Sequence, residues 1–236
     1  METDSLTDTP ICIYAVADIH GKKDRAETIE QIVQRFRPHA VVMAGDLTQY
    51  FRSRPIIELI DRLPVPVLGV RGNSDFKSTG RQLDDCSNFT LLSHPPAPIR
   101  GIAFHGFNGT LPLPFVTRTG MGEARDVETM IAHCQSPHIL VAHPPPRGTL
   151  DKVGGRFSAG SHGIAKCIRA TRPMVMICGH IHEQAGWALR NETLVVNCAM
   201  GPENAGALIT LEKNRAVAIR PLKHARDDGK EIRLNR

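Results

Sequence analysis

The sequence predicts an α/β protein in which the central strands of the sheet run parallel. In the first two-thirds of the 236-residue chain, apolar strand-like runs alternate with amphipathic helix-like segments. Strands that alternate with helices pair in parallel through right-handed crossovers. Short strand-like runs separated by turn residues fill the C-terminal third, which indicates antiparallel hairpins. A chain of this length is expected to form a single domain, 1–236, with loosely ordered ends at 1–10 and about 223–236.

Apolar runs bounded by polar or turn residues define the expected strands. Five of these runs have the near-continuous apolar character of buried strands: 11–17, 40–44, 65–70, 138–141 and 174–178. The remaining expected strands are 89–92, 99–105, 185–190, 193–197, 206–211 and 216–220. The pairs 191–192 and 213–214 are expected to form the turns of two hairpins.

Helices are expected where apolar residues recur three and four positions apart. Four segments meet this criterion: 23–37, 53–63, 123–135 and 161–172. Pro38 ends the first of them, because proline cannot continue a helix. Ser53 is a candidate cap at the start of the second.

Polar side chains stand directly after each of the five buried strands. They are Asp18 and His20, Asp46, Asn73, His143, and His180 with His182. Because ligands of an open α/β sheet lie at the carboxyl ends of its strands, we expect these side chains to meet at one edge. Mixed imidazole, carboxylate and amide donors suit manganese, iron, zinc or cobalt better than calcium or magnesium alone. The pattern therefore predicts a site for two divalent metals that suits hydrolysis of a phosphate ester.

The spacing of the motifs predicts how the ligands share the ions. Residues i and i+2 of an extended strand point to the same side, so Asp18 and His20 would reach one ion together. The same argument applies to His180 and His182. The carboxylate of Asp46 is able to bridge two ions, because each of its two oxygens can face a different metal.

Each of these residues also has an ordinary structural explanation. Asp18 or Asp46 could cap the helix that follows its strand, and Asn73 could form a turn. A single histidine is more often a surface or core residue than a ligand. The structural explanations together require five coincidences at five strand ends, so we prefer the metal-binding interpretation. Glycines at 21, 45, 72 and 179 also fit tight turns beside a crowded site.

Composition and charge exclude several classes of protein. Hydrophobic residues make up 41% and charged residues 22% of the chain, as in ordinary globular domains, and no apolar stretch approaches the ~20 residues of a membrane span. The N-terminus does not resemble a secretory signal, so a cytoplasmic location is expected. The six cysteines lack zinc-finger or redox spacing, and disulfides are not expected. The net charge of +5 fits an anionic substrate, but its basic residues are dispersed along the chain.

Two long loops, 106–122 and 144–160, are rich in Gly, Pro and Thr and leave the same edge of the sheet. Loops of this length without periodicity are often functional. We expect them to form the rim that faces the substrate.

In their order along the chain, the polar motifs resemble those of the calcineurin-like metallophosphoesterase superfamily. The motifs are Asp-x-His at 18–20, Gly-Asp at 45–46, Gly-Asn at 72–73, a lone histidine at 143 and Gly-His-x-His at 179–182. The segments 143–152, 179–183 and 193–197 narrow the resemblance to small bacterial and archaeal phosphoesterases and to the metallophosphoesterase-domain proteins of animals. The resemblance implies a four-layer α/β/β/α sandwich, in which two mixed sheets pack face to face between helices.

The resemblance also implies a division of the ligands between two divalent transition-metal ions, manganese first, with iron, zinc, cobalt and nickel as alternatives. In the scheme of the family, the first ion takes Asp18, His20 and His182, the second takes Asn73, His143 and His180, and Asp46 bridges them. A hydroxide that bridges the metals then attacks phosphorus in line with the leaving oxygen.

Further roles are expected for residues next to these ligands. Asp46 and Asn73 are predicted to be catalytic, and Asn73 also to bind substrate. Arg71 is a second candidate for binding the substrate phosphate. Glu183 is expected to orient His182 through its second ring nitrogen.

One position departs from the pattern of the family. The motif usually continues as Gly-Asn-His followed by Glu or Asp, and that histidine assists the leaving group, whereas Ser74 and Asp75 follow Asn73 here. A serine hydroxyl is a poor acid near neutral pH, so cleavage of esters with poor leaving groups is in question. His105 is the candidate for a compensating catalytic acid, and His162 is a weaker one.

Three functions compete at this point. The complete ligand set favours a metal-dependent phosphoric ester hydrolase, a phosphodiesterase or phosphatase whose partner is a phosphorylated small molecule such as a nucleotide. The alternative is a phosphoesterase-like, non-catalytic binding module that holds metal weakly, which Ser74 alone favours. A nuclease is disfavoured, because aromatic residues make up only 5% of the chain and no basic stripe is present. Neither a membrane nor a nucleic acid is expected as a partner, and the oligomeric state has no signature in the sequence.

Overall fold

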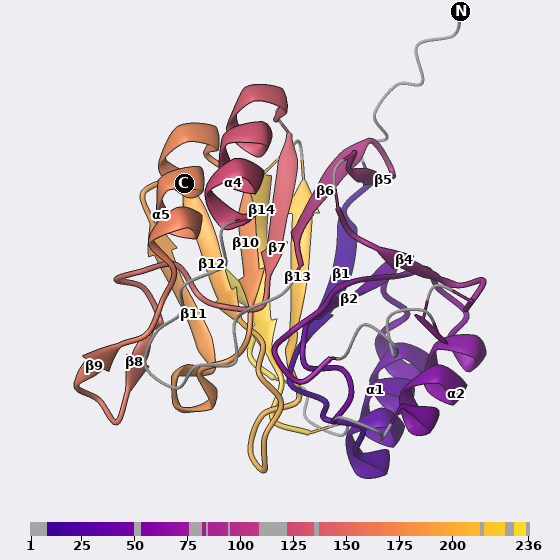
Figure 1. Ribbon diagram of the computed structural model, residues 1–236. Coiled ribbons are helices and arrows are strands. Elements are labelled where there is room, and N and C mark those ends of the chain that lie inside the picture. Colours follow the sequence, from indigo (N-terminus) through magenta and orange to yellow (C-terminus); the bar gives the residue numbers. More distant parts are fainter. Residues whose placement is uncertain are drawn as a thin grey trace, which may run out of the picture.

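The computed structural model describes residues 9–49, 53–75, 82–83, 85–93, 95–108, 122–134, 137–212, 215–224 and 229–234. In these ranges two mixed sheets pack face to face, and helices cover the outer face of each (Figure 1). The chain therefore has the α/β/β/α layers that the resemblance implied. Of the ends expected to be loosely ordered, 1–8, 225–228 and 235–236 lie outside the described residues.

The larger sheet has the strand order β15-β14-β13-β1-β2-β3-β4. Its strands are β1 Ile11–Val16, β2 Ala40–Ala44, β3 Val67–Val70, β4 Phe89–Leu91, β13 Ala207–Glu212, β14 Arg215–Pro221 and β15 Ile232–Arg233. β1 to β4 run parallel to one another, and β13 joins β1 antiparallel. Helices α1 Lys23–Phe36 and α2 Arg54–Arg62 cover the outer face, with apolar residues at the predicted helical spacing.

The smaller sheet has the order β11-β12-β10-β7-β6-β5. Its strands are β5 Ala97–Ile99, β6 Ile102–Phe107, β7 His138–Ala142, β10 Val175–Cys178, β11 Gly186–Arg190 and β12 Thr193–Asn197. β6, β7, β10 and β12 are parallel, and the two edge strands are antiparallel. Helices α4 Gly122–His133 and α5 His162–Thr171 cover its outer face. Both predicted C-terminal hairpins are present as β11–β12 and β13–β14.

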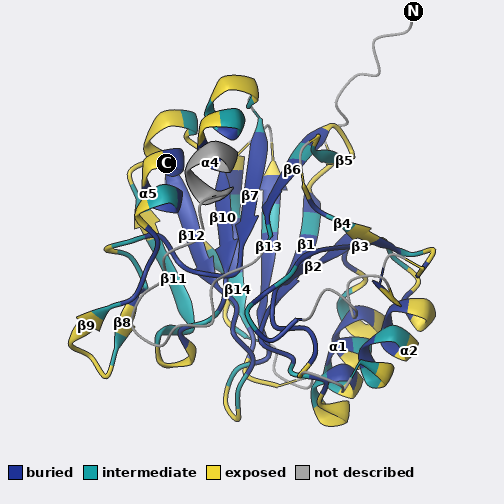
Figure 2. Ribbon diagram, in the orientation of Figure 1, coloured by how far each residue is buried: buried dark blue, intermediate teal, exposed yellow. Residues whose placement is uncertain are grey.

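Three apolar layers hold the sandwich together. The middle layer lies between the sheets and contains Ile13 and Phe104. Tyr14, the next residue of β1, points the other way into the layer under α1 and α2. Met176 and Ile164 belong to the third layer, under α4 and α5. Because both faces of each sheet are covered, the central strands are buried along their length (Figure 2), which explains their near-continuous apolar sequences.

The expected strand 99–105 is wrong as a single element. Ile99 ends β5, and a turn at Arg100 (φ 47°) and Gly101 (φ 80°) reverses the chain before β6 begins. β6 then continues through Phe107, so the first expected rim loop starts later than predicted. Residues 109–121 of that loop lie outside the described part of the chain.

The second expected rim loop and the expected loose tail also differ from the prediction. Within 144–160 the chain forms a short antiparallel hairpin, β8 Lys152–Val153 and β9 Phe157–Ser158. In the tail, β15 pairs with β14, so part of 223–236 extends the larger sheet.

All six cysteines are free thiols. None of the helices in the described ranges is long and apolar enough to cross a membrane.

Candidate metal centre

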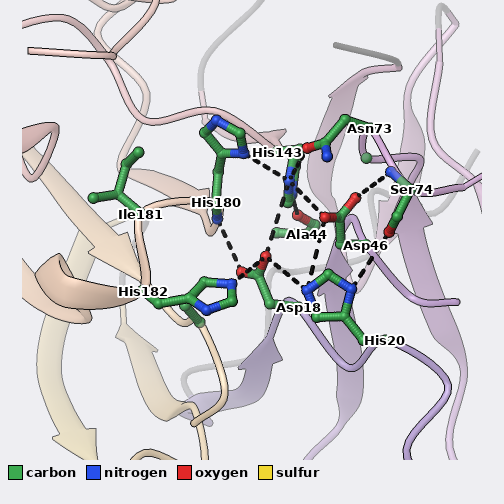
Figure 3. Close-up of polar contacts among 12 residues, drawn as sticks. Asp18, His20, Ala44, Asp46, Asn73, Ser74, His143, His180, Ile181 and His182 are labelled. Carbon is green, nitrogen blue, oxygen red and sulfur yellow. Dashed lines mark hydrogen bonds and ion pairs between the residues drawn. The ribbon is translucent and has the colours of Figure 1, made fainter. Parts of the chain in front are cut away.

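The ends of five strands, three from the larger sheet and two from the smaller, meet at one place. The backbone N–H of Asp18 after β1 donates to Gly45 O after β2, at 3.0 Å. Gly179 after β10 donates in the same way to His143 O after β7, at 2.9 Å. Each of these bonds joins neighbouring loops of one sheet. The side chains of all seven residues predicted from the motifs lie together across the two sheets (Figure 3), namely Asp18, His20, Asp46, Asn73, His143, His180 and His182.

Left-handed backbone, and not strand alternation, sets the direction of four of these side chains. Asp18, His20, Asp46 and His180 have φ values of 57°, 53°, 51° and 72°. Residues other than glycine rarely adopt this conformation, which costs roughly 1–2 kcal/mol per residue. Strained backbone of this kind gathers at functional sites, where the surrounding structure enforces it. The i, i+2 argument was therefore wrong in its physical basis: β1 ends at Val16, before Asp18.

Asp18 presents one oxygen to the backbone and the other to imidazoles. Its Oδ2 accepts the backbone N–H of His180 at 2.9 Å. Its Oδ1 lies 3.1 Å from His182 Nε2, 3.8 Å from His20 Nε2 and 3.9 Å from His143 Nε2. The side chain is only 1% exposed, so this oxygen faces three ring nitrogens out of contact with solvent.

Asp46 is oriented in the same way. Its Oδ1 accepts the backbone N–H of Ser74 at 2.8 Å. Its Oδ2 lies 3.4 Å from His143 Nε2 and 3.9 Å from His20 Nε2. A single oxygen, and not one oxygen on each side, therefore faces both halves of the cluster.

His143 is fully buried and held from behind. Its Nδ1 lies 2.9 Å from Ala44 O and donates to it, which fixes the ring so that Nε2 faces the cluster. That nitrogen lies 3.0 Å from Asn73 Oδ1 and 3.2 Å from His180 Nδ1. Electron-rich atoms at such distances repel unless a proton or a metal ion lies among them. The donor set and the ring orientation thus fit a metal whose imidazole ligand is fixed by a backbone carbonyl.

The charges of the cluster lead to the same conclusion. Burial opposes ionisation of Asp18 and Asp46, but the hydrogen bond of Asp18 with His182 and the charge of His143 beside Asp46 hold the pKa of both carboxyl groups below its usual value. Burial also favours neutral His143, yet the Asp46 carboxylate raises the pKa of that ring to about 9. Burial and the neighbouring His143 lower the pKa of His180 to about 4. Two anions therefore hold positive charge in the centre of the cluster.

In the described part of the chain, two groups of side chains each have ligand atoms within 4.8 Å of one another: Asp18 with His20 and His182, and Asp18 with Asp46 and His143. Asp18 belongs to both groups, whereas the family scheme gives the shared position to Asp46. In this structure the oxygens of both aspartates lie between the two halves.

Two residues that support the cluster, Asp75 and Arg25, had no predicted role. Asp75 accepts the backbone N–H groups of Leu47, Thr48 and Gly72 at 2.8–3.1 Å, and so joins the loops after β2 and β3. Arg25, from α1, donates to the backbone carbonyl of Asp18. Asp75 follows the Gly-Asn-Ser motif directly, which was its only signal in the sequence.

Ser74 has a structural role at the position where the family has its histidine. Its hydroxyl donates to Thr48 O at 2.8 Å and lies 3.5 Å from His20 Nδ1. Only 6% of the residue is exposed. The hydroxyl is therefore committed to a backbone carbonyl and is not directed toward solvent.

Other predicted residues lie away from the cluster or have different partners. His105 lies on β6, where its Nε2 is 3.6 Å from Cys134 Sγ and its ring packs edge-on against His138, so the structure does not bring it to the metal centre. His162 is exposed at the start of α5. Arg71 directly precedes the Gly72-Asn73 motif, and its backbone N–H donates to Asn108. Glu183 was expected to orient His182, but its carboxylate accepts the N–H of Gly154 at 2.7 Å.

Comparison with known proteins identifies the family and the fold. Residues 11–206 match the calcineurin-like phosphoesterase superfamily domain, and the chain belongs to this family of metal-dependent phosphoesterases. This confirms the resemblance that the motifs indicated.

The individual proteins that the chain resembles have low sequence identity to it. The UPF0046 protein K07C11.7 of Caenorhabditis elegans is 28% identical over 118 residues, which span 48% of this chain but only 38% of the worm protein. The crystal structure of TT1561 of Thermus thermophilus has a TM-score of 0.67 at 15% identity and covers 88% of this chain and 97% of its own. A dimetal phosphatase from Danio rerio has a TM-score of 0.64 at 12% identity, with 95% and 99% covered. At these identities, the two structures show a shared fold.

Proposed function

We propose that this protein is a phosphoric ester hydrolase that uses two divalent transition-metal ions, with manganese as the first candidate. The observation that carries the proposal is the arrangement around His143 Nε2. That nitrogen faces Asp46 Oδ2 at 3.4 Å, Asn73 Oδ1 at 3.0 Å and His180 Nδ1 at 3.2 Å, and all of them are metal-ligand atoms. When bound, the two ions would supply a nucleophilic water and neutralise charge on the phosphoryl group.

The described contacts support the following assignment of ligands. Asp18, His20 and His182 would hold one ion. Asn73, His143 and His180 would hold the other. Asp46 would be shared by both, because its Oδ2 lies 3.4 Å from His143 Nε2 and 3.9 Å from His20 Nε2.

The remaining groups would position the substrate. Asn73 is only partly buried, so its amide can also reach a phosphoryl oxygen. Arg71, two residues earlier, would supply a positive charge for the phosphate. Ser74 would not protonate a leaving group, because its hydroxyl donates to Thr48 O. We therefore expect activated esters, such as aryl esters, to be cleaved faster than alkyl esters.

The proposal is tested by hydrolysis of bis(4-nitrophenyl) phosphate with added manganese or cobalt. Asp46→Asn keeps the size of the side chain but removes its charge, and we expect kcat/KM to fall at least about 100-fold. Asp24→Asn, on the exposed side of α1, is the matched control and should retain the wild-type rate. Equal rates for wild type and Asp46→Asn would rule out the proposal.

The second candidate is a non-catalytic module with weak metal occupancy, which the commitment of Ser74 to Thr48 favours. Metal analysis of the purified protein separates the two. About two equivalents of transition metal per chain support the hydrolase, and a chain that stays metal-free at saturating manganese supports the module.

A further inference from the structure

The β8–β9 hairpin projects from the body of the molecule beside the loops that carry the metal-centre residues (Figure 1). Val153 and Phe157 pair directly across its two strands and therefore share one face. Phe157 is 68% exposed, the largest exposed fraction of any large apolar side chain in the described residues. One exposed apolar residue is ordinary on a protein surface. What distinguishes Phe157 is how firmly, and where, its hairpin is held.

The hairpin is fixed at its turn and at its base. Isolated two-stranded hairpins are only marginally stable in water, so this one needs support. Gly154 and Gly155 have φ of 57° and 66°, as in the tight turns that match the twist of paired strands. At the base, the buried carboxylate of Asp151 accepts the N–H groups of Gly148 at 3.0 Å and Gly160 at 3.3 Å. The backbone that carries Phe157 is therefore held in one position.

The turn of the hairpin is hydrogen-bonded to the residue that follows the ligand candidate His182. Gly154 N–H donates to Glu183 Oε2 at 2.7 Å, and Glu183 directly follows the ligand candidate His182. The side chain of His182 is 49% exposed, so the cluster opens to solvent at this residue. The loop that carries the hairpin begins directly after His143. The hairpin thus borders the open half of the site.

Charge on the hairpin fits an anionic ligand with an apolar part. Lys152 and Arg156 are both exposed and lie on either side of the turn. A phenylalanine ring presents a flat surface that stacks on aromatic groups, as protein aromatics do with bases. Lys152 alternates with Val153 along β8 and so points to the face opposite Phe157, whereas Arg156 directly precedes Phe157 in the turn. An aromatic ring on a rigid arm beside the site matches an ester whose phosphate enters the metal centre and whose organic group stays outside it.

We infer that Phe157 is a specificity-determining residue, and that its ring packs against an aromatic group, an aryl ring or a nucleobase, of a phosphate ester bound at the metal centre. This inference rests on the proposed function for the position of the phosphate. It names the class of substrate: aromatic esters in preference to small alkyl esters.

Binding tests the inference without turnover. Calorimetry on the manganese-loaded protein compares phenylphosphonate with methylphosphonate. Wild type should bind the phenyl compound about tenfold more tightly, and Phe157→Ala should lose that preference, because base or aryl stacking is worth about this factor. Leu189→Ala removes the other exposed large apolar side chain, which is 47% exposed on β11, and should keep the preference. Phe157→Tyr should keep it too. No preference in wild type, or a preference unchanged in Phe157→Ala, overturns the inference.

Turnover gives an independent result. 4-Nitrophenyl phenyl phosphate and 4-nitrophenyl ethyl phosphate share a leaving group and differ only in the group retained on phosphorus. Phe157→Ala should raise KM about tenfold for the phenyl ester alone, with kcat unchanged. Equal changes for both esters overturn the inference. If wild type binds phenylphosphonate selectively but hydrolyses neither ester, the proposed function fails and the binding role of Phe157 stands.

Phe157 could instead lie between two copies of the chain. Sedimentation of wild type and Phe157→Ala at the assay concentration separates this outcome. A wild-type dimer that becomes a monomer in the variant would assign the ring to a protein contact and overturn the inference.

Discussion

The two halves of the metal centre differ in how they meet solvent. His143, in the half that faces Asn73 and His180, is completely buried and is fixed by the carbonyl of Ala44. In the other half, the side chains of His20 and His182 are 20% and 49% exposed. The buried half is shaped by the core of the protein before anything binds. The open half is where an ion or a substrate enters, and its ligands are held more loosely. The predictions below test this difference, beginning with the largest effect.

His143→Ala should damage both activity and stability. The substitution leaves a cavity and an unsatisfied buried carbonyl at Ala44, which together cost about 3 kcal/mol of unfolding free energy. We expect kcat/KM to fall at least about 100-fold, because the ligand of the buried half is lost. Urea unfolding and steady-state hydrolysis measure the two effects. A variant as stable as wild type would show that the buried ring is not part of the structural framework.

Removal of metal should lower stability by a similar amount. Ions that bind only the folded chain stabilise it by about 2.7 kcal/mol at about 100 times their dissociation constant. For a chain of this size, chelation should therefore lower the melting temperature by roughly 5–10 °C, and added manganese should restore it. Asp46→Asn provides the control, because its melting temperature should respond much less to manganese. An identical response from the two proteins would place the stabilising ion elsewhere.

His182→Ala should separate metal binding from folding. Its half-exposed ring contributes little to the core, so we expect the unfolding free energy to fall by only about 1.5 kcal/mol, through loss of the hydrogen bond to Asp18. Activity should fall roughly 10- to 100-fold, with about one equivalent of metal retained. His162→Ala, another exposed histidine, should change neither quantity. If His182→Ala is destabilised as much as His143→Ala, the distinction between the halves is wrong.

Ser74→Ala should have the smallest effect. The hydroxyl stabilises the site by donating to Thr48 O, and its loss should cost about 1 kcal/mol of unfolding free energy. Activity toward aryl esters should change by less than about twofold, because the hydroxyl is not directed at the substrate. Ser87→Ala, at an exposed position, is the matched control and should be neutral. A large fall in activity with stability intact would give Ser74 a catalytic role.

The motifs predicted the layers, through the family that they resemble, and the seven residues of the metal centre. They did not predict which atoms of those residues face one another. Apolar runs and helical spacing placed most elements within a few residues, because these signals are local. The left-handed backbone at Asp18 and His20 could not be predicted locally, since aspartate and histidine are enriched in this conformation but still adopt it in only a few per cent of cases. The orientation of Asp46 depends on Ser74 N–H from another loop, which is a tertiary contact.

The missed elements have the same explanation. The hairpin with Gly154 and Gly155 is too short for periodicity, although its glycine pair is a turn signal. Glu183 looked like a support for His182 because it follows it in sequence, yet its partner is Gly154 on the hairpin. β15 depends on pairing with β14 and not on its own composition. Contacts between distant segments decide these details, and local pattern does not contain them.

Three glycines around the centre have a practical consequence for anyone who would redesign the protein. A methyl group at Gly45, Gly72 or Gly179 would come closer than 3.0 Å to the side chains of His143, Asp46 and Asp18 respectively. In a directed-evolution library randomised at these positions, most members will be unable to assemble the metal centre. By contrast, a methyl group at Gly154 or Gly155 meets no atom within 4 Å, although their positive φ favours keeping glycine there. Diversity is better placed at Lys152, Arg156 and Phe157, where new chemistry can be sampled without disturbing the machinery beneath.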